Sequence, residues 1–321
     1  MNVVDSTPGL PLWLSALLTT AAILVVLALV NYAASRLAER RHPPTGAFLD
    51  IDGARLHYSD RGTGRPIVLL HGNAVTGDDY NTSGVAEQLL GTYRVIIFDR
   101  PGFGHSSRPR GRLWTASEQA DLVHRALLQL GVQQALMVGH SWGTLVALAL
   151  AERHPASTGG LVLLSGYYFP TPRLDALMVA PAVFPVLGDV LRYTISPLFG
   201  WLTMPMMKRA MFAPAPVTER FQCEYSTAMA LRPSQIRATA SDGVLMVPGA
   251  AGLSAHYSAL LMPVAIVAGD GDKVVEPEQA ERLKRTVPNG TLETVAGAGH
   301  MVHHVAMQQV VEAIEQVARR S

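Results

Sequence analysis

The stretch QALMVGHSWGTLVALALA, residues 134–151, restricts the possible folds of this chain more than any other. Its first part is typical of a short buried strand and its last part of a buried helix. Gly139 and Gly143 permit a tight turn and a close approach of the helix to the strand. Ser141 lies at the apex of that turn, where the N-terminus of the following helix favours negative charge. This arrangement predicts a nucleophilic serine, and the alternative is a small residue that fits a crowded turn.

The chain around this stretch repeats the same alternation of strand and helix. Short runs rich in Val, Ile and Leu are apolar on consecutive positions, as strands covered on both faces of a parallel sheet must be. Helical segments separate them at 85–92, 117–131 and 143–155. We therefore expect a mostly parallel, doubly wound α/β sheet flanked by helices. The expected strands are 66–72, 93–102, 135–141, 161–166, 263–270 and 291–297.

Two departures from the alternation define the rest of the organisation. Residues 47–62 alternate apolar and polar positions on both sides of Asp52-Gly53, which predicts an antiparallel hairpin. From about 167 to 261 no run resembles a buried parallel strand, so a helical cap is expected between two late strands. The expected parts are an N-terminal segment (1–35), a linker (36–46), an α/β core (47–166 and 262–321) and a cap or lid (167–261).

The N-terminal segment contains an uncharged apolar run at about 12–34. As a helix with a rise of ~1.5 Å per residue, this run is long enough to cross a ~30 Å hydrocarbon layer. It lacks the basic start of a signal peptide and is longer than a signal peptide's apolar region. A single transmembrane helix is therefore favoured over a signal peptide or a buried core helix. Because Asp5 precedes the run and Arg36, Arg40 and Arg41 follow it, we expect the C-terminal domain on the cytoplasmic side.

The composition argues against several classes of function. The formal net charge is only +1 over 321 residues, without long like-charge blocks, so no nucleic-acid partner is expected. The single cysteine, Cys223, excludes an internal disulfide framework and a multi-cysteine metal site. The eleven histidines include no H-E-x-x-H pair. We expect neither a metal nor a cofactor, and the oligomeric state stays open.

A serine alone is a poor nucleophile, so it needs a base and a group that orients the base. Both residue types follow later strands of the expected sheet. PVAIVAGDGDKVVEP (263–277) ends a strand with Asp270 and Asp272, and TVAGAGHMVHH (294–304) ends the next strand with His300. The order serine, acid, histidine along the chain is the one found in α/β-hydrolases.

Five separate motifs occur along the chain: LLHGN (69–73), FDRPGFGHS (98–106), GHSWG (139–143), AGDGD (268–272) and GAGHMVHH (297–304). With these motifs, the region from about residue 48 to the C-terminus resembles the α/β-hydrolase superfamily. The resemblance implies the α/β-hydrolase fold, with Ser141 as nucleophile and His300 as general base and then general acid. Relatives tend to show G-x-x-D after the acid-bearing strand, which points to Asp272 as the orienting carboxylate, with Asp270 as the alternative.

The resemblance also implies an oxyanion hole made by the backbone N–H groups of Asn73 and Trp142. The side chains of the same two residues are similar to those with which haloalkane dehalogenases hold a halide, but the nucleophile of those enzymes is an aspartate. Ser141 attacking an alkyl halide would leave an ether with no carbonyl for water to attack, so turnover would stop. Ser141 therefore disfavours dehalogenation, and epoxide hydrolysis by the aspartate route, and favours acyl chemistry.

The remaining polar residues of these motifs receive structural interpretations. His71, in the HG turn, and His140, next to Ser141, are expected to be structural rather than catalytic. Asp99 is expected to shape a loop at the sheet edge. His303 and His304 follow His300 at an expected helix start, where we expect partly exposed polar positions.

The apolar segment 174–212 of the expected cap contains four methionines near Phe199 and Trp201. Flexible thioethers and aromatic rings line adaptable apolar pockets, but they also fill ordinary cores. Near a membrane anchor, a third interpretation is that part of this surface rests on lipid.

Together these observations predict a membrane-anchored serine hydrolase, most simply a serine esterase, acting on a small apolar acyl substrate. One alternative uses the same triad to hydrolyse a C–C bond or to transfer an acyl group to an acceptor other than water. A second alternative is a ligand-binding or sensing protein that keeps the fold without turnover, which a complete candidate triad disfavours. The substrate itself cannot be read from the sequence.

Overall fold

The computed structural model describes residues 10–173 and 179–321. Its centre is an eight-stranded sheet with the strand order β1-β2-β4-β3-β5-β6-β7-β8. The pairs from β4 to β8 are parallel, whereas β2 is antiparallel to both β1 and β4. The strands are β1 (Ala47–Ile51), β2 (Ala54–Arg61), β3 (Arg65–Leu70), β4 (Tyr93–Phe98), β5 (Ala135–His140), β6 (Thr158–Leu164), β7 (Val264–Gly269) and β8 (Gly290–Val295).

This sheet confirms the predicted fold class. Each expected strand is present with bounds within a few residues, and the antiparallel hairpin opens the sheet. Asp52 and Gly53 form its two-residue turn with φ values of 51° and 77°. Positive φ at both central positions is what a tight hairpin turn needs, and the Asp-Gly pair adopts it readily.

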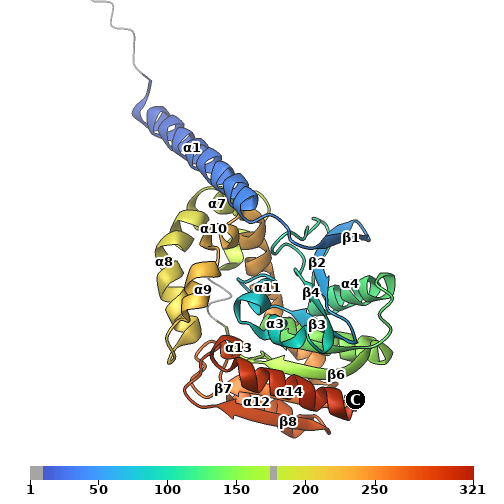
Figure 1. Ribbon diagram of the computed structural model, residues 1–321. Coiled ribbons are helices and arrows are strands. Elements are labelled where there is room, and N and C mark those ends of the chain that lie inside the picture. The colour runs from blue at the N-terminus through green and yellow to red at the C-terminus, as the bar shows by residue number, and fades with distance from the viewer. Residues whose placement is uncertain (1–9, 174–178) are drawn as a thin grey trace, which may run out of the picture.

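Helices cover both faces of the sheet (Figure 1) and create two separate cores. Alternate residues of one strand serve the two cores, since Val68 and Leu70 of β3 join one and Ile67 and Leu69 join the other. The first core lies under α4, α5 and α12, and the second under α3 and α14. The flanking helices are α2 (Asp79–Thr82), α3 (Val85–Leu89), α4 (Ala116–Gln129), α5 (Trp142–Arg153), α12 (Glu278–Thr286), α13 (Val302–Val305) and α14 (Met307–Arg320).

Between β6 and β7 the described residues form helices and no strand, as the missing strand pattern predicts. Residues 174–178 of the apolar segment lie outside the described part of the chain. The division into a core and a separate cap stays a prediction. The elements are η2 (Ala180–Val183), α7 (Leu187–Tyr193), α8 (Ile195–Phe212), α9 (Glu219–Glu224), α10 (Thr227–Ala230), α11 (Pro233–Ser254) and η3 (Tyr257–Ala259).

One buried charge cluster joins α11 to the rest of the protein. Asp242, on α11, is fully buried and accepts hydrogen bonds from Arg100 and from Arg108, the latter at 2.8 Å. Arg100 also donates to the backbone oxygens of His71 (2.8 Å) and Gly72 (2.9 Å), in the loop after β3. Two guanidinium groups around one carboxylate therefore fix α11 against that loop.

The N-terminal helix α1 runs from Leu12 to Arg41 and stands out from the body of the molecule (Figure 1). It is long and apolar enough to cross a membrane, and its most apolar window contains no buried residue, which excludes the interpretation as a buried core helix. The boundary predicted for the linker (36–46) is wrong, because residues 36–41 continue the helix. The helix ends just before two prolines, which cannot extend it. Residues 1–9, including Asp5, lie outside the described part.

The last turns of α1 are attached to the helical segment between β6 and β7. The Asn31 side chain donates to the backbone oxygens of Tyr193 (2.8 Å) and Thr194 (2.9 Å). Nearer the end of α1, Glu39 forms an ion pair of 3.0 Å with Arg232, whose side chain is only 5% exposed. These contacts hold α1 against the junction of α7 and α8 and against the start of α11.

Candidate active site

The turn that carries Ser141 is sharply bent. β5 ends at His140 and α5 begins at Trp142, so Ser141 alone connects strand and helix. Its φ of 52° and ψ of −120° lie in a region that costs a non-glycine residue about 1–3 kcal/mol. A Cβ on Gly143 would lie 2.2 Å from the backbone oxygen of Leu70, and one on Gly139 would lie 2.7 Å from that of Gly143. The two glycines are therefore required by the close approach of strand and helix.

The structure brings Ser141, His300 and Asp272 into one hydrogen-bonded line. His300 Nε2 lies 2.8 Å from Ser141 Oγ, and His300 Nδ1 lies 2.8 Å from Asp272 Oδ2. The ring accepts the serine proton at Nε2 when Nδ1–H donates to the carboxylate. His300 and Asp272 are only 4% and 5% exposed, whereas Ser141 is half-buried. The arrangement can deprotonate the hydroxyl and stabilise the resulting imidazolium.

Of the two carboxylates that follow β7, only Asp272 reaches His300. Asp272 Oδ1 accepts the backbone N–H groups of Val274 (2.8 Å) and Val275 (3.0 Å), which fixes the carboxylate while Oδ2 faces the histidine. Asp270 instead accepts the N–H of Gly297 at 2.8 Å, at an exposed turn. The geometry therefore selects Asp272 over Asp270.

The expected oxyanion residues lie at the start of α5 and after β3. Neither backbone N–H, of Asn73 or of Trp142, has a hydrogen-bond acceptor within the described ranges. Both side chains are already engaged by α11, because Asn73 Nδ2 donates to Thr239 O (3.0 Å) and Trp142 Nε1 donates to Asp242 O (2.8 Å). The indole N–H of Trp142 and one of the two amide N–H groups of Asn73 are thus used to position α11.

His71 supports the loop after β3 without entering the triad. It is fully buried, its Nε2 accepts the backbone N–H of Arg100 at 2.9 Å, and its Nδ1 donates to Gly72 O at 2.7 Å. Burial, together with the positive charge of Arg100, lowers the pKa of His71 to about 4. A neutral ring is what this hydrogen-bond pattern needs.

The interpretation as a partly exposed position is wrong for His303, which is buried, and holds for His304 only through its backbone. Their side chains are 0% and 1% exposed, and each donates at 2.8 Å to a different oxygen of Asp79. Although burial would raise the pKa of Asp79, the two histidines hold it well below its ordinary range. Asp79, in the short helix α2, had no distinguishing sequence signal, because its partners lie more than 220 positions away.

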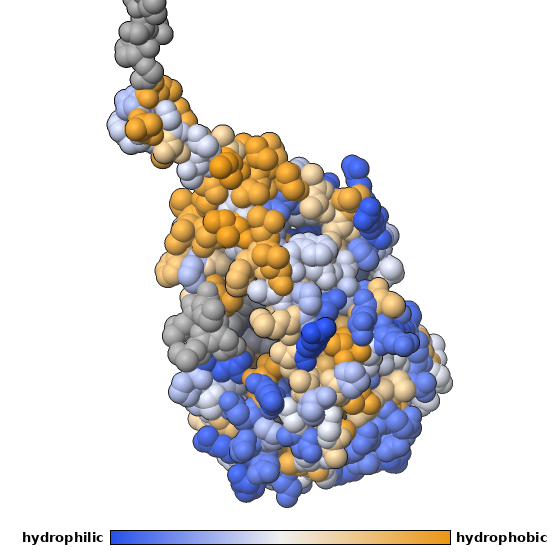
Figure 2. Space-filling model, turned by 90° about the vertical axis from the view of Figure 1, so that its left-hand side faces the viewer, coloured by the Kyte–Doolittle hydropathy of each residue, from blue (hydrophilic) through white to orange (hydrophobic). Residues whose placement is uncertain are grey.

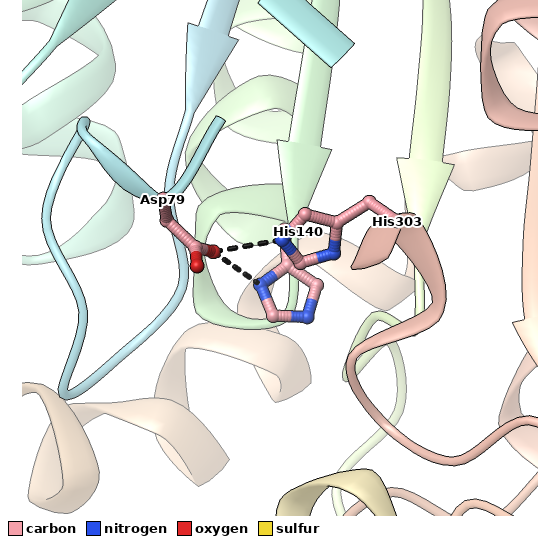
Figure 3. A group of neighbouring side chains, drawn as sticks. All are labelled: Asp79, His140 and His303. Carbon is pink, nitrogen blue, oxygen red and sulfur yellow. Dashed lines mark hydrogen bonds and ion pairs between the residues drawn. The ribbon is translucent and has the colours of Figure 1, made fainter. Parts of the chain in front are cut away.

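Figure 3 shows how Asp79, His140 and His303 face one another from α2, β5 and α13. They offer ligand atoms within 4.8 Å of one another, the residue types and spacing that a metal ion could use. His303 donates to Asp79, whereas His140 Nδ1 lies 4.0 Å from Asp79 Oδ2 and is buried without a hydrogen-bond partner among the described residues. His140 Nε2 donates to the backbone oxygen of His300 at 3.1 Å, and burial lowers the pKa of His140 well below its ordinary value. His140 is therefore a neutral ring that contacts the backbone of the triad histidine, His300.

Asp99 supports the loop at the sheet edge. It is 5% exposed, and its carboxylate accepts the N–H groups of Gly77 (2.8 Å) and His105 (2.9 Å) and pairs with His57 Nδ1 at 2.8 Å. Burial raises the pKa of Asp99, but the hydrogen bond and charge of His57 outweigh it, so the pKa is lowered.

A cavity of about 340 Å³ lies beside the triad region and not in it. The end of α1, the loop at 75–82 and helices α9 and α10 enclose it, and none of Ser141, Asp272 and His300 lines it.

Three comparisons with known proteins agree on the fold and differ on the activity. The "Haloalkane dehalogenase 2" of Mycobacterium tuberculosis is 26% identical over 291 residues, which cover 85% of this chain and 94% of that protein. The "2-hydroxymuconate semialdehyde hydrolase" of Pseudomonas putida is 32% identical over 155 residues, 48% of this chain and 55% of that protein. A solved "membrane phospholipase A, a novel bacterial virulence factor" superposes with a TM-score of 0.66 at 18% identity, covering 96% of this chain and 97% of that one.

A family model described as "alpha/beta hydrolase fold" matches residues 65–306. This range contains Ser141, Asp272 and His300, and it runs through the parallel part of the sheet. With the family model matching most of the chain and the sheet and turns described above, the protein belongs to the α/β-hydrolase fold family.

Proposed function

We propose that this protein is a serine hydrolase that cleaves an apolar ester through an acyl-enzyme. The observation that supports this best is the 2.8 Å contact of His300 Nε2 with Ser141 Oγ, together with the 2.8 Å contact of His300 Nδ1 with Asp272 Oδ2. A serine, a neutral base and an orienting carboxylate in this order perform nucleophilic acyl transfer.

In the proposed reaction, the Ser141 hydroxyl gives its proton to His300 Nε2 as Oγ attacks the ester carbonyl carbon. The tetrahedral intermediate collapses, and the leaving alcohol takes the proton from His300. A water molecule then gives a proton to His300 and attacks the carbonyl carbon of the acyl-enzyme. This second tetrahedral intermediate collapses, the carboxylic acid leaves, and Ser141 Oγ takes the proton back from His300. Asp272 holds the ring and stabilises its protonated form throughout.

The negative oxygen of each tetrahedral intermediate is assigned to the backbone N–H groups of Asn73 and Trp142. Removing one donor from such a hole typically costs about 3 kcal/mol of transition-state stabilisation. Support comes from the two N–H groups, which have no acceptor among the described residues, and from their places in the chain. Trp142 follows Ser141 directly, and Asn73 follows Gly72, where an added Cβ would lie 3.1 Å from Ser141 Cβ.

Dehalogenation is disfavoured although a dehalogenase is among the similar proteins. The nucleophile position holds Ser141, which cannot be regenerated from an alkyl ether by water. The single indole N–H of Trp142, moreover, donates to a carbonyl oxygen of α11 and is not free to hold a halide, and one of the two amide N–H groups of Asn73 also donates to α11.

Hydrolysis of a C–C bond is the second candidate. The observation in its favour is the 32% identity to a hydrolase of 2-hydroxymuconate semialdehyde over 48% of this chain. The same triad serves both reactions, so the products distinguish them: an ester yields a carboxylate and an alcohol.

We further propose that α1 anchors the protein in a membrane as a single span with the catalytic domain on the cytoplasmic side. The uncharged run at 12–34 and the arginines that follow it support this topology. A reporter that is active only outside the cytoplasm, fused after Ser321, should be inactive, and its activity would contradict the orientation.

The function is tested with the purified full-length chain and p-nitrophenyl esters of increasing acyl length. Ser141→Ala should abolish hydrolysis. Ser165→Ala is a matched control, since Ser165 is also buried and also has a positive φ, 44°. Ester hydrolysis by the Ser141→Ala variant at the wild-type rate would refute the assignment. A wild-type protein that cleaves no ester but splits a diketone-type substrate would favour the C–C reaction.

A further inference from the structure

An apolar surface begins where α1 contacts the rest of the protein and extends over α7 and α8. We call it the α7–α8 surface. Figure 2 shows hydrophobic side chains gathered there, below the projecting helix, while the opposite end of the same face is mostly hydrophilic. On α8 the exposed positions recur at the spacing of one helical face, which is normally the face turned toward a core. The exposed large apolar residues of this surface are Phe184, Val186, Leu187, Val190, Tyr193, Ile195, Leu198, Phe199, Trp201, Leu202 and Met206.

This surface carries almost no charge. From Tyr193 to Met207 the sequence contains no Asp, Glu, Lys or Arg, and the first charges that follow are Lys208 and Arg209. Leu202 is 82% exposed and Phe199 and Trp201 are each 62% exposed. A soluble monomer rarely leaves so large a contiguous apolar area in water. We therefore expect another apolar surface to bind over it.

The contacts of α1 show at which depth the surface lies. Asn31 on α1 is bonded to the backbone at Tyr193 and Thr194, the junction of α7 and α8. Asn31 is inside the apolar run 12–34, three residues before its end, and so about 4.5 Å from that end at ~1.5 Å per residue. If α1 crosses the bilayer, the junction of α7 and α8 lies at the edge of the hydrocarbon layer or a few ångströms inside it. That depth agrees with the ~5–10 Å at which interfacial helices bury their apolar faces.

The same helix connects this surface to the triad. α8 begins beside Asn31 and ends at Phe212, about 27 Å along its axis for 18 residues. Its far end packs on the loop of His300: the Met301 N–H donates to Met211 O at 3.3 Å, and a Cβ on Gly299 would lie 2.2 Å from Ala213 O. One continuous helix therefore has its first turns at membrane depth and its last turn against the catalytic histidine.

We propose that the α7–α8 surface is embedded in the leaflet at the C-terminal end of α1. We propose further that the substrate is an apolar acyl lipid or other bilayer-dissolved ester. The occupant of the surface is the lipid bilayer, because the surface continues that of α1 at the same depth and has no charged residue from Tyr193 to Met207. The acid of α7, Asp189, is paired with Arg110 and Arg192. This proposal rests on the proposed ester hydrolysis for its substrate class, but the lipid contact does not depend on activity.

The lipid contact is tested by fluorescence of Trp201. Of the four tryptophans, Trp114 and Trp142 are buried, so Trp13→Phe leaves Trp201 as the exposed one. In phosphatidylcholine vesicles, lipids brominated on the acyl chain should quench the Trp13→Phe protein, while aqueous iodide should not. Quenching no greater than that of a Trp13→Phe/Trp201→Phe baseline would overturn the proposal. A second copy of the chain is the other possible cover of this surface. In that case bromolipid would not affect Trp201 emission, and the mass of the protein in detergent would fall in Phe199→Glu/Leu202→Glu. This result would also overturn the proposal.

The substrate class is tested with Phe199→Glu/Leu202→Glu, at two exposed positions outside the triad. Hydrolysis of a long-chain p-nitrophenyl ester in vesicles should fall by at least about tenfold, because two large side chains are withdrawn from hydrocarbon and one alone accounts for about that factor. Hydrolysis of p-nitrophenyl acetate in water should not change. Leu261→Glu is the matched control, 72% exposed and located before the start of β7, and should leave both rates unchanged. An equal loss with both esters, or none, would refute the link between surface and substrate, whereas a wild-type protein inactive on every ester would refute only the proposed function.

Discussion

Replacement of Asp242 by Asn tests whether the buried charge cluster holds α11 on the core. Asp242 and the side chain of Arg100 are at most 1% exposed, and the side chain of Arg108 is 5% exposed. The amide keeps the shape of the carboxylate but removes its charge and turns one acceptor into a donor. Two guanidinium groups would then be buried without compensation, which typically costs about 3–5 kcal/mol.

This free energy converts into a shift of the thermal midpoint. At about 2.1 cal/mol/K per residue, 321 residues have an unfolding entropy of about 0.7 kcal/mol/K, so 3–5 kcal/mol corresponds to about 4–7 °C. The assay is thermal unfolding of the full-length protein in detergent, followed by circular dichroism. The midpoint of Asp242→Asn should fall by this amount.

Glu224→Gln provides the matched control. Glu224 pairs with Arg220 four residues away, and both side chains are 45% exposed, so this pair should contribute less than about 1 kcal/mol. A midpoint for Asp242→Asn within 1 °C of that of Glu224→Gln would refute the reasoning. It would mean that the cluster is hydrated or that α11 is held by apolar packing alone.

Three further predictions concern the site and its surroundings. Asp272→Asn should lower kcat by about 10³–10⁴-fold while Asp270→Asn stays near wild type, as measured with a p-nitrophenyl ester, and the reverse ranking would contradict the triad. Gly143→Ala should abolish activity or folding, because its Cβ would lie 2.2 Å from Leu70 O; expression and circular dichroism separate the two outcomes, and a fully active variant would contradict the close approach. Since burial lowers the pKa of His71 from 6.5 to about 4, the unfolded chain binds more protons in that window, so stability is full above pH 6.5 and falls as the pH drops toward 4, by about 3 kcal/mol from this group. Denaturant midpoints across this range should fall less steeply in His71→Gln, and an unchanged slope would contradict the role of the neutral ring.

The sheet and most of the triad could be predicted from the sequence because their signals are local. A strand buried on both faces is apolar on consecutive positions, and Gly139, Ser141 and Gly143 stand where one such strand meets a helix. The choice between Asp270 and Asp272 was harder, since the two carboxylates are neighbours. Two backbone N–H groups that fix Asp272 decide it, and their direction is a property of the folded turn.

The contacts of Asp79 could not be predicted, for a physical reason. His303 and His304 are adjacent in sequence, and a pair of polar residues at a helix start ordinarily faces water. Here a carboxylate from 224 positions earlier in the chain compensates both imidazoles, so both become buried. No periodicity in either segment encodes such a pairing.

The most direct test of the central claim is the site of covalent labelling by a fluorophosphonate, read by mass spectrometry of the intact protein and its peptides. The account predicts one adduct per chain, on Ser141, that is absent in Ser141→Ala and forms far more slowly in His300→Ala. An adduct on another residue, or hydrolysis of esters by a protein that never labels at Ser141, would contradict it.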